Sequence, residues 1–181
     1  DSDEAGRLLR IYQQYFMVSN AAQLILKEQK ELGHDLNDLD KYVAIQINDT
    51  HPSLVIPELI RLLMAEGMLQ KEAIAVVSRT CAYTNHTILA EALEKWPIQI
   101  FRELLPRVYQ IVEEINRRLG VELSEKLRDD YETQHRMSII SNGMIHMARM
   151  AIYASFSVNG VATLHTEILK TVELKEWYNL Y

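Results

Sequence analysis

The sequence contains few of the residues that define several specialised protein classes. Its 181 residues include one cysteine, Cys81, together with six glycines and four prolines. A single cysteine excludes a disulfide framework and is typical of a reducing compartment, so we expect a cytoplasmic location. The low glycine and proline content, beside 48% hydrophobic residues, excludes a disordered or collagen-like chain. The composition therefore indicates a globular domain with enough apolar residues for a core.

Further absences limit the possible partners. No run of about 20 apolar residues occurs, so we expect no membrane span. The 25 acidic residues outnumber the 19 basic ones and give a net charge of −6, whereas a nucleic-acid surface requires clustered Lys and Arg. No glycine-rich phosphate loop and no paired cysteines or histidines at metal-ligand spacing are present. We therefore expect no nucleic-acid partner, no nucleotide site and no metal site.

Hydrophobic periodicity predicts an α/β chain that is predominantly helical, with two or three short strands. The expected strands span residues 43–47 and 156–161, whereas residues 34–41 and 81–87 are expected to be loops. Gly33 and Gly67 are expected to end helices, and the charged residues 122–134 to lie at the surface. The helices are predicted over residues 8–31, 53–66, 71–80, 90–95, 102–119, 145–153 and 163–178. Of these, residues 71–80 could also be a buried strand, because periodicity cannot decide so short an apolar run, and the helix is the favoured interpretation.

Two polar clusters contain the candidate chemistry. One spans residues 48–51, and the other spans residues 84–87 and is followed by Glu91 and Glu94. Asn and His both donate and accept hydrogen bonds, so this mixture suits a polyhydroxylated ligand. The same residue types also favour turns and helix caps, which is the interpretation that spacing alone favours. A hydrolase using Glu91 and Glu94 is disfavoured, because carboxylates so close on one helix cannot flank a glycosidic bond.

Four segments provide a more specific signal. They are residues 43–52, 80–87, 91–97 and 158–162, and their order and spacing resemble the glycogen (α-glucan) phosphorylase family. The resemblance covers essentially the whole chain but only a central part of that longer enzyme. It implies a two-domain, Rossmann-like fold of the GT-B glycosyltransferase type. We therefore expect residues 1–181 to form one fragment, mostly from the N-terminal domain and reaching the domain junction near residues 155–181.

The resemblance also implies an activity for the longer enzyme. That activity is the pyridoxal-phosphate-dependent phosphorolysis of terminal α-1,4-linked glucose to glucose 1-phosphate. By the same resemblance, His86 and Asn159 are the substrate-binding residues, which hydrogen-bond the 6-hydroxyl of the glucosyl unit. The residues implied to line the pocket beside the anomeric carbon are Asp49, His51, Thr87, Glu91 and Glu94.

Departures from the family pattern limit what this chain can do by itself. It has no segment like the lysine motif that holds pyridoxal phosphate, no glycine-rich loop and no basic phosphate-binding residues. Glu28 follows Lys27 where animal enzymes have an arginine pair, which indicates a bacterial pattern without nucleotide activation. We therefore expect the fragment to contain no complete catalytic site and to bind no pyridoxal phosphate.

The expected partners follow from the same resemblance. The longer enzyme is expected to be a homodimer acting on α-glucan and phosphate. The isolated fragment is expected to self-associate, because a part taken from a larger fold exposes apolar surface. The alternative interpretation is a stand-alone helical interaction module without catalysis.

Overall fold

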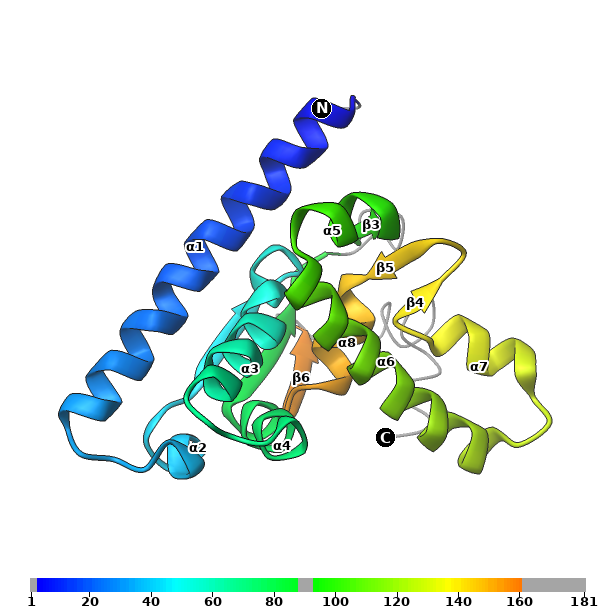
Figure 1. Cartoon of the computed structure of the whole chain (residues 1–181). Helices are drawn as coiled ribbons and strands as arrows, with labels where there is room; N and C mark the ends of the chain where they lie inside the picture. Colours follow the sequence, from blue (N-terminus) through cyan, green and yellow to red (C-terminus); the bar gives the residue numbers. More distant parts are fainter. Residues whose placement is uncertain (1–2, 88–92, 161–181) are drawn as a thin grey trace.

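The computed structural model describes residues 3–87 and 93–160, which form a mostly helical body around two small sheets. In Figure 1, α1 (Glu4–Glu31) is a long rod along one side of this body. The remaining elements are η1 (Leu36–Asp38), α2 (Leu39–Tyr42), β1 (Ile45–Asn48), η2 (His51–Leu54), α3 (Val55–Ala65), α4 (Gln70–Thr80), β2 (Cys81–Asn85), β3 (Lys95–Pro97), α5 (Ile98–Leu104), α6 (Pro106–Leu127), α7 (Tyr131–Met137), β4 (Ile140–Ser141), β5 (Met144–His146), α8 (Met147–Tyr153) and β6 (Ser157–Gly160).

Most of the predicted helices are confirmed. Asp3 caps α1 by accepting a hydrogen bond from the Gly6 N–H at 2.7 Å, and Gly33 ends the helix region with a φ of 76°. The helices predicted over residues 53–66 and 71–80 are present as η2 with α3, and as α4. The predicted final helix over residues 163–178 lies outside the described residues.

The helix predicted over residues 102–119 is wrong at both ends. It is divided at Leu105 into α5 and α6, because Pro106 has no N–H to continue the first helix but starts a new one well. The second helix then passes through Gly120 to Leu127, since Leu119 and Leu123 continue its buried stripe. Residues 34–41, predicted to be a plain connector, contain η1 and most of α2.

The three strands of the first sheet run parallel in the order β1-β2-β6. The predicted strands at residues 43–47 and 156–161 are confirmed as β1 and β6. The loop predicted over residues 81–87 is wrong, because residues 81–85 form the central strand. Cys81, Tyr83 and Asn85 are buried and alternate with partly exposed neighbours, which is the period of a pleated strand.

The second sheet is antiparallel in the order β3-β5-β4. A tight turn with positive φ at Asn142 (52°) and Gly143 (72°) joins β4 to β5, as two-residue hairpins require. The helix predicted over residues 145–153 therefore begins only at Met147. Residues 95–97 form β3. The helix predicted over residues 90–95 is therefore wrong at Lys95, which is the first residue of a strand. The described part contains six strands, more than the two or three predicted.

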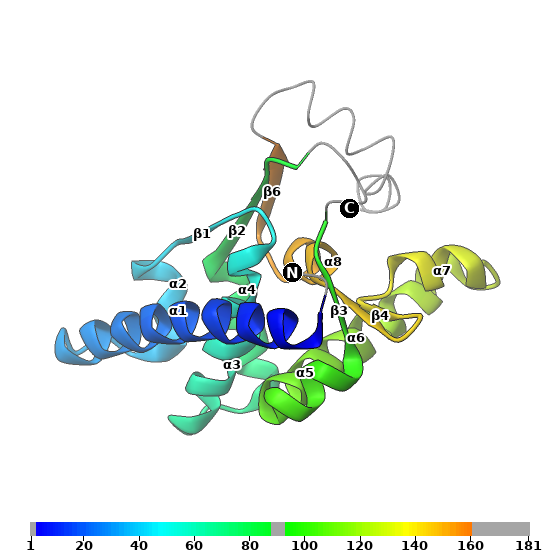
Figure 2. The same ribbon diagram turned by 90° about the horizontal axis from the view of Figure 1, so that it is seen from above.

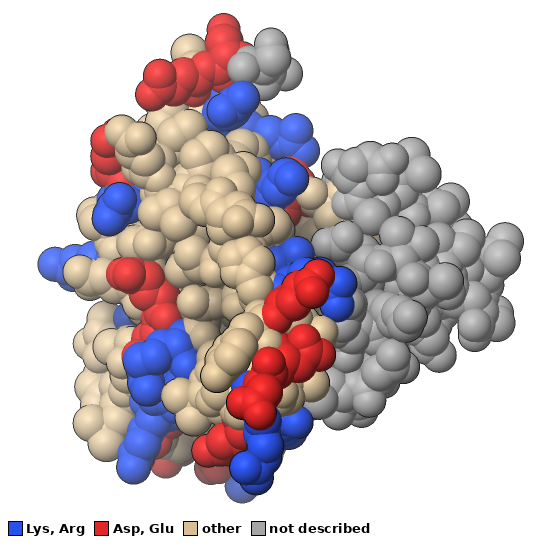
Figure 3. Space-filling model, turned by 90° about the vertical axis from the view of Figure 1, so that its right-hand side faces the viewer, with Lys and Arg blue, Asp and Glu red and all other residues tan. Residues whose placement is uncertain are grey.

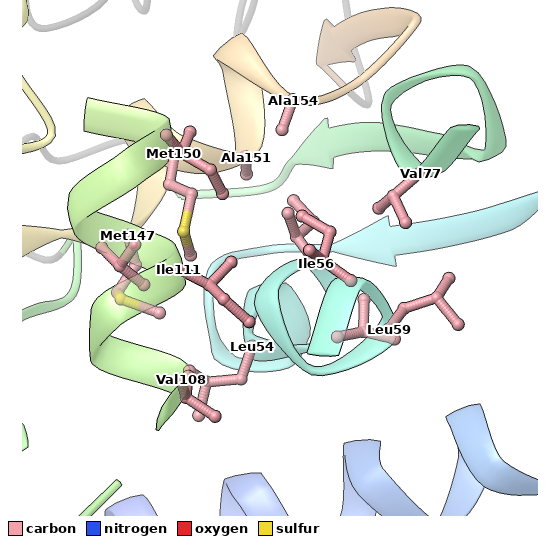
Figure 4. Close-up of a cluster of buried hydrophobic side chains, with 14 of the residues drawn as sticks. Leu54, Ile56, Leu59, Val77, Val108, Ile111, Met147, Met150, Ala151 and Ala154 are labelled. Carbon is pink, nitrogen blue, oxygen red and sulfur yellow. The ribbon is translucent and has the colours of Figure 1, made fainter. Parts of the chain in front are cut away.

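The hydrophobic core lies between one face of the parallel sheet and the helices. Figure 4 shows side chains from η2, α3, α4, α6 and α8 converging on one cluster. Helix α3 lies at its centre, where Ile56, Leu59 and Ile60 are each 0% exposed. Full burial of such a side chain stabilises the fold by about 1.5–3 kcal/mol. The core therefore depends most on α3, in which seven of the 11 residues are buried.

Neither sign of charge gathers into a patch on the face of the molecule that Figure 3 shows. On the face in Figure 3, acidic and basic side chains are interspersed. Hydrogen bonds from Arg117 and Arg118 lower the pKa of Glu114 on α6 to about 2. Most of residues 122–134 are exposed, as predicted. Within the described ranges, no helix is both long and apolar enough to cross a bilayer.

A buried carboxylate joins α1 to α3, which lie side by side in Figures 1 and 2. Glu58 is 0% exposed, and Arg61 donates two hydrogen bonds to its two oxygens at 2.6 and 2.8 Å. The hydroxyls of Tyr15, at 3.0 Å, and Ser19 on α1 also donate to Glu58. Burial and the neighbouring carboxylate raise the pKa of Tyr15.

Glu58→Ala is expected to lower the free energy of unfolding by about 3 kcal/mol, because three donors lose a buried acceptor. Urea unfolding followed by circular dichroism measures the change. Glu66→Ala is the matched control, since it removes an exposed ion pair with Lys30 on α1. That control is expected to cost less than about 1 kcal/mol. Equal losses in the two variants would contradict a special role for the buried carboxylate.

Candidate functional site

The carboxyl ends of the three parallel strands meet at one edge of the sheet. Asp49 directly follows β1, His86 and Thr87 directly follow β2, and Asn159 lies near the end of β6. Their proximity follows from the register, which pairs Asn48 with Thr84 and Thr84 with Asn159. Ligands of open α/β sheets bind outside the carboxyl ends of the strands. This edge is therefore the candidate binding site.

Asp49 links the ends of β1 and β2. Its N–H donates to the Thr84 carbonyl at 2.8 Å, and its Oδ1 accepts from the His86 N–H at 2.6 Å. The Thr87 hydroxyl also lies 3.5 Å from this oxygen. Asp49 has a φ of 63°, a left-handed conformation that Asp tolerates better than most residues. The strained backbone thus directs one carboxylate at the loop that contains His86.

Asn85 shapes the same loop from the buried side. Its side chain is 1% exposed, donates to the Tyr83 hydroxyl at 2.9 Å and accepts from the Thr87 N–H at 2.6 Å. An Asn that binds the backbone two residues later forms a tight turn. Asn85 therefore stabilises the turn after β2, and this turn leaves the neighbouring His86 exposed and available to a ligand.

The other predicted pocket residues, His51, Glu91 and Glu94, do not all lie at this edge of the sheet. His51 is exposed at the start of η2, two residues beyond Asp49. Glu94 forms an ion pair with Arg10 and accepts from Gln14 Nε2 at 3.2 Å, so α1 holds this carboxylate. Glu91 lies outside the described residues. The structure thus brings Asp49, Thr87 and the Asn159 strand together and places Glu94 against α1.

Sequence reasoning missed Gln46 on β1, and it placed Thr84 in a polar cluster without giving it a role in the site. Thr84 donates to Asn159 Oδ1 at 2.7 Å, and Gln46 Nε2 donates to the Thr84 hydroxyl at 2.8 Å. The available signal was the alternation of polar and apolar residues along β1 and β2. Alternation indicates which side chains share a face, but it does not identify the neighbouring strand.

A serine–histidine contact elsewhere is structural. Ser141 Oγ lies 3.0 Å from His146 Nε2 across the β4–β5 hairpin. Arg149 donates to Ser141 Oγ at 3.2 Å and to the Ser138 carbonyl at 2.9 Å. Burial, with the charge of Arg149 second, lowers the pKa of His146 to about 4. Ser141 is only 7% exposed, so this contact stabilises the hairpin and offers little access to a substrate.

The described lysines and metal-ligating side chains limit which cofactors this part of the chain could hold. A lysine that forms a Schiff base is normally buried with a lowered pKa. The lysines at positions 27, 30, 41, 71, 95 and 126 are all exposed, and ion pairing raises the pKa of Lys41. These lysines do not fit pyridoxal phosphate. No group of three or more His, Cys, Asp or Glu in the described ranges is placed to hold a metal ion.

Comparison with known proteins identifies the family. The model of the carbohydrate phosphorylase family matches residues 1–181. The chain is 56% identical to the maltodextrin phosphorylase of Streptococcus pneumoniae over 181 residues, which cover 100% of this chain and 23% of that relative. It belongs to the carbohydrate phosphorylase family.

Two other relatives extend this similarity. The Bacillus subtilis glycogen phosphorylase is 44% identical over 182 residues, which cover 100% of this chain and 23% of the relative. The human muscle form of glycogen phosphorylase is 44% identical over 187 residues, which cover 97% of this chain and 22% of the relative. The chain thus spans about a quarter of the length of these relatives.

Asp49→Ala is expected to speed hydrogen exchange at the His86 amide about tenfold or more, because a charge-assisted hydrogen bond is lost. Amide exchange followed by NMR measures the rate. Asp49→Asn keeps an acceptor and tolerates the left-handed backbone, so an intermediate rate is expected. An unchanged His86 rate in Asp49→Ala would show that Asp49 does not hold this loop.

Proposed function

We propose that this chain forms part of the glucosyl-binding pocket of an α-glucan phosphorylase. The reaction transfers the terminal α-1,4-linked glucosyl unit from glucan to inorganic phosphate, releasing glucose 1-phosphate and a glucan shorter by one unit. The observation that best supports this function is the convergence of Asp49, the His86 loop and Asn159 at one sheet edge. Family membership supports the same reaction.

His86 and Asn159 are proposed to bind the 6-hydroxyl of the glucosyl unit. Imidazole and amide groups can each donate and accept, so together they can satisfy both the proton and the lone pairs of a hydroxyl. Asp49 and Thr87 are proposed to line the pocket beside the anomeric carbon, together with His51, Glu91 and Glu94. In this proposal the residues of the chain bind and orient the sugar.

The pyridoxal phosphate of the family is proposed to be held by parts of the enzyme outside this chain. The exposed lysines of the described residues support this division of labour. The isolated chain is therefore expected to be inactive and to bind no pyridoxal phosphate.

The chain is proposed to belong mostly to the N-terminal domain of a two-domain GT-B fold and to reach the domain junction near residues 155–181. The open face of the parallel sheet supports this placement. Gln46, Asn48, Ser157 and Asn159 are exposed there, whereas parallel sheets are normally covered on both faces. We also propose a cytoplasmic, homodimeric enzyme, and the free, buried Cys81 agrees with a reducing compartment.

Phosphorolysis by the longer natural protein that contains this chain tests the function. Glucose 1-phosphate is expected from maltodextrin and phosphate, and His86→Ala is expected to lower kcat/KM about tenfold or more through loss of one substrate hydrogen bond. His135→Ala is the control, because the exposed His135 ring lies on α7 and forms a hydrogen bond of 3.2 Å with Asn142 in the turn between β4 and β5. Hydrolysis to free glucose without phosphate, or no reaction at all, would refute the proposal.

The alternative, a stand-alone helical interaction module, is supported by the apolar residues exposed along α1. Leu9, Tyr12, Phe16, Met17 and Leu24 are each more than half exposed. In an α-glucan phosphorylase, this surface is expected to be covered by the rest of the protein. The flanking reading frame separates the two functions, because a phosphorylase requires coding sequence for the cofactor lysine.

The isolated chain is expected to self-associate through the exposed face of α1. Light scattering should detect a dimer or a larger species, and Phe16→Lys should shift it toward the monomer, because a charge in an apolar contact is costly. Tyr131→Lys on α7 is the control, since Tyr131 is equally exposed, at 71% against 70% for Phe16. A strictly monomeric wild-type chain would contradict this expectation.

A further inference from the structure

His86 is held through the two peptide groups that flank it. The His86 N–H, in the peptide group shared with Asn85, donates to Asp49 Oδ1 at 2.6 Å. The Thr87 N–H, in the peptide group on the other side of His86, donates to Asn85 Oδ1 at 2.6 Å. Each peptide group is planar, so the backbone of His86 can rotate only about the two bonds that join these groups to its Cα. Fixing both groups therefore fixes the direction in which the His86 side chain leaves the backbone.

The two acceptors differ in their surroundings. Asp49 follows β1 and is only partly buried, whereas Asn85 is the last residue of β2 and is 1% exposed. Asn85 Nδ2 donates at 2.9 Å to the hydroxyl of Tyr83, which is also 1% exposed. Because a buried polar group is costly to leave unpaired, the Asn85 amide cannot readily give up these partners. Asn85 is therefore fixed to the strand at one end and to the turn at the other.

The orientation of the Asn85 amide follows from its partners. A backbone N–H can only donate, so the amide atom that faces the Thr87 N–H must be the oxygen. The other end of the amide is then Nδ2, which donates to the Tyr83 hydroxyl oxygen. In the opposite orientation, two donors, Nδ2 and the Thr87 N–H, would face each other at the same short distance. The Asn85 side chain therefore has one stable orientation, and so does the turn that it closes.

We propose that Asn85, anchored by Tyr83, is a positioning residue of the glucosyl pocket, which directs the His86 imidazole at the 6-hydroxyl of the sugar. This inference rests on the proposed function, which assigns His86 to that hydroxyl. Asn85 acts without touching the sugar, because its amide is buried and bonded at both ends. A side chain whose direction is set before binding loses less conformational entropy when its ligand binds. The Tyr83–Asn85 pair therefore favours glucose over a sugar that lacks the 6-hydroxyl.

Donor discrimination by the longer phosphorylase tests this role. In the direction of synthesis, the enzyme transfers a glucosyl unit from glucose 1-phosphate to the end of a glucan and releases phosphate. The measured quantity is kcat/KM for glucose 1-phosphate divided by kcat/KM for 6-deoxyglucose 1-phosphate. This donor ratio reports recognition of the 6-hydroxyl, since a loss of correctly folded enzyme lowers both values equally.

Three substitutions separate the two bonds of the Asn85 amide. Asn85→Leu removes the donor and the acceptor at similar volume, and is expected to lower the donor ratio about fivefold, the effect of one neutral hydrogen bond. Asn85→Asp keeps an oxygen for the Thr87 N–H and forms the same turn, so most of the wild-type ratio is expected to remain. Tyr83→Phe removes only the anchoring hydroxyl, and is expected to lower the ratio about twofold.

Thr80→Val is the matched control. Thr80 is 0% exposed and donates to the Val76 carbonyl at 2.8 Å, just before the amino end of β2. The substitution therefore removes one buried hydrogen bond at constant volume, at the end of the strand away from His86. It is expected to leave the donor ratio unchanged.

An unchanged donor ratio in Asn85→Leu, or an equal fall in Thr80→Val, would overturn the positioning role. If Asn85→Leu does not fold, Tyr83→Phe decides, because an unchanged ratio in that variant would refute the role as well. A wild-type protein without phosphorolysis would instead refute the proposed function. A wild-type phosphorylase that uses both donors equally well would refute the assignment of His86 to the 6-hydroxyl, and with it the role of Asn85.

Discussion

The parallel pairing of β2 with both β1 and β6 is the constraint on which the site depends. Strands that are 36 and 75 residues apart in the chain are placed side by side by this pairing, with their carboxyl ends at one edge. Asp49, His86 and Asn159 have no local reason to meet, since each belongs to a different strand–loop unit. The backbone ladder brings them together, and the Asp49 carboxylate then restrains the loop after β2.

The two faces of this sheet have different chemistry. Helix α3 packs into the core on the buried side, where Glu58 also ties it to α1 through Tyr15 and Ser19. The opposite face has polar, uncharged side chains that hydrogen-bond across the strands. A rigid, covered side and a polar, open side are the arrangement expected when a sheet supports a site shared with another part of a larger protein.

The elements that sequence reasoning predicted well are those with strong local signals. Helix α1 begins at an Asp cap and ends near a glycine with positive φ, and α3 follows a clear apolar pattern. The strand β2 was missed because its polar residues resemble loop chemistry, and only burial between two neighbouring strands makes it a strand. Residues 145 and 146 are predicted to be helical for a similar reason, but they form a strand, because their pairing partners Trp96 and Lys95 lie far away in the chain.

The sequence by itself determined the family, the apolar faces of the helices and the residue types available for a sugar pocket, because motifs and periodicity are local properties. The assignment of His86 and Asn159 to the sugar also comes from resemblance and stays a prediction. Only the tertiary structure decided that Gln46 and Thr84 connect to Asn159, and that Glu94 is held by Arg10 of α1. Those contacts depend on strand order, register and helix packing, which bring together residues that no local pattern relates.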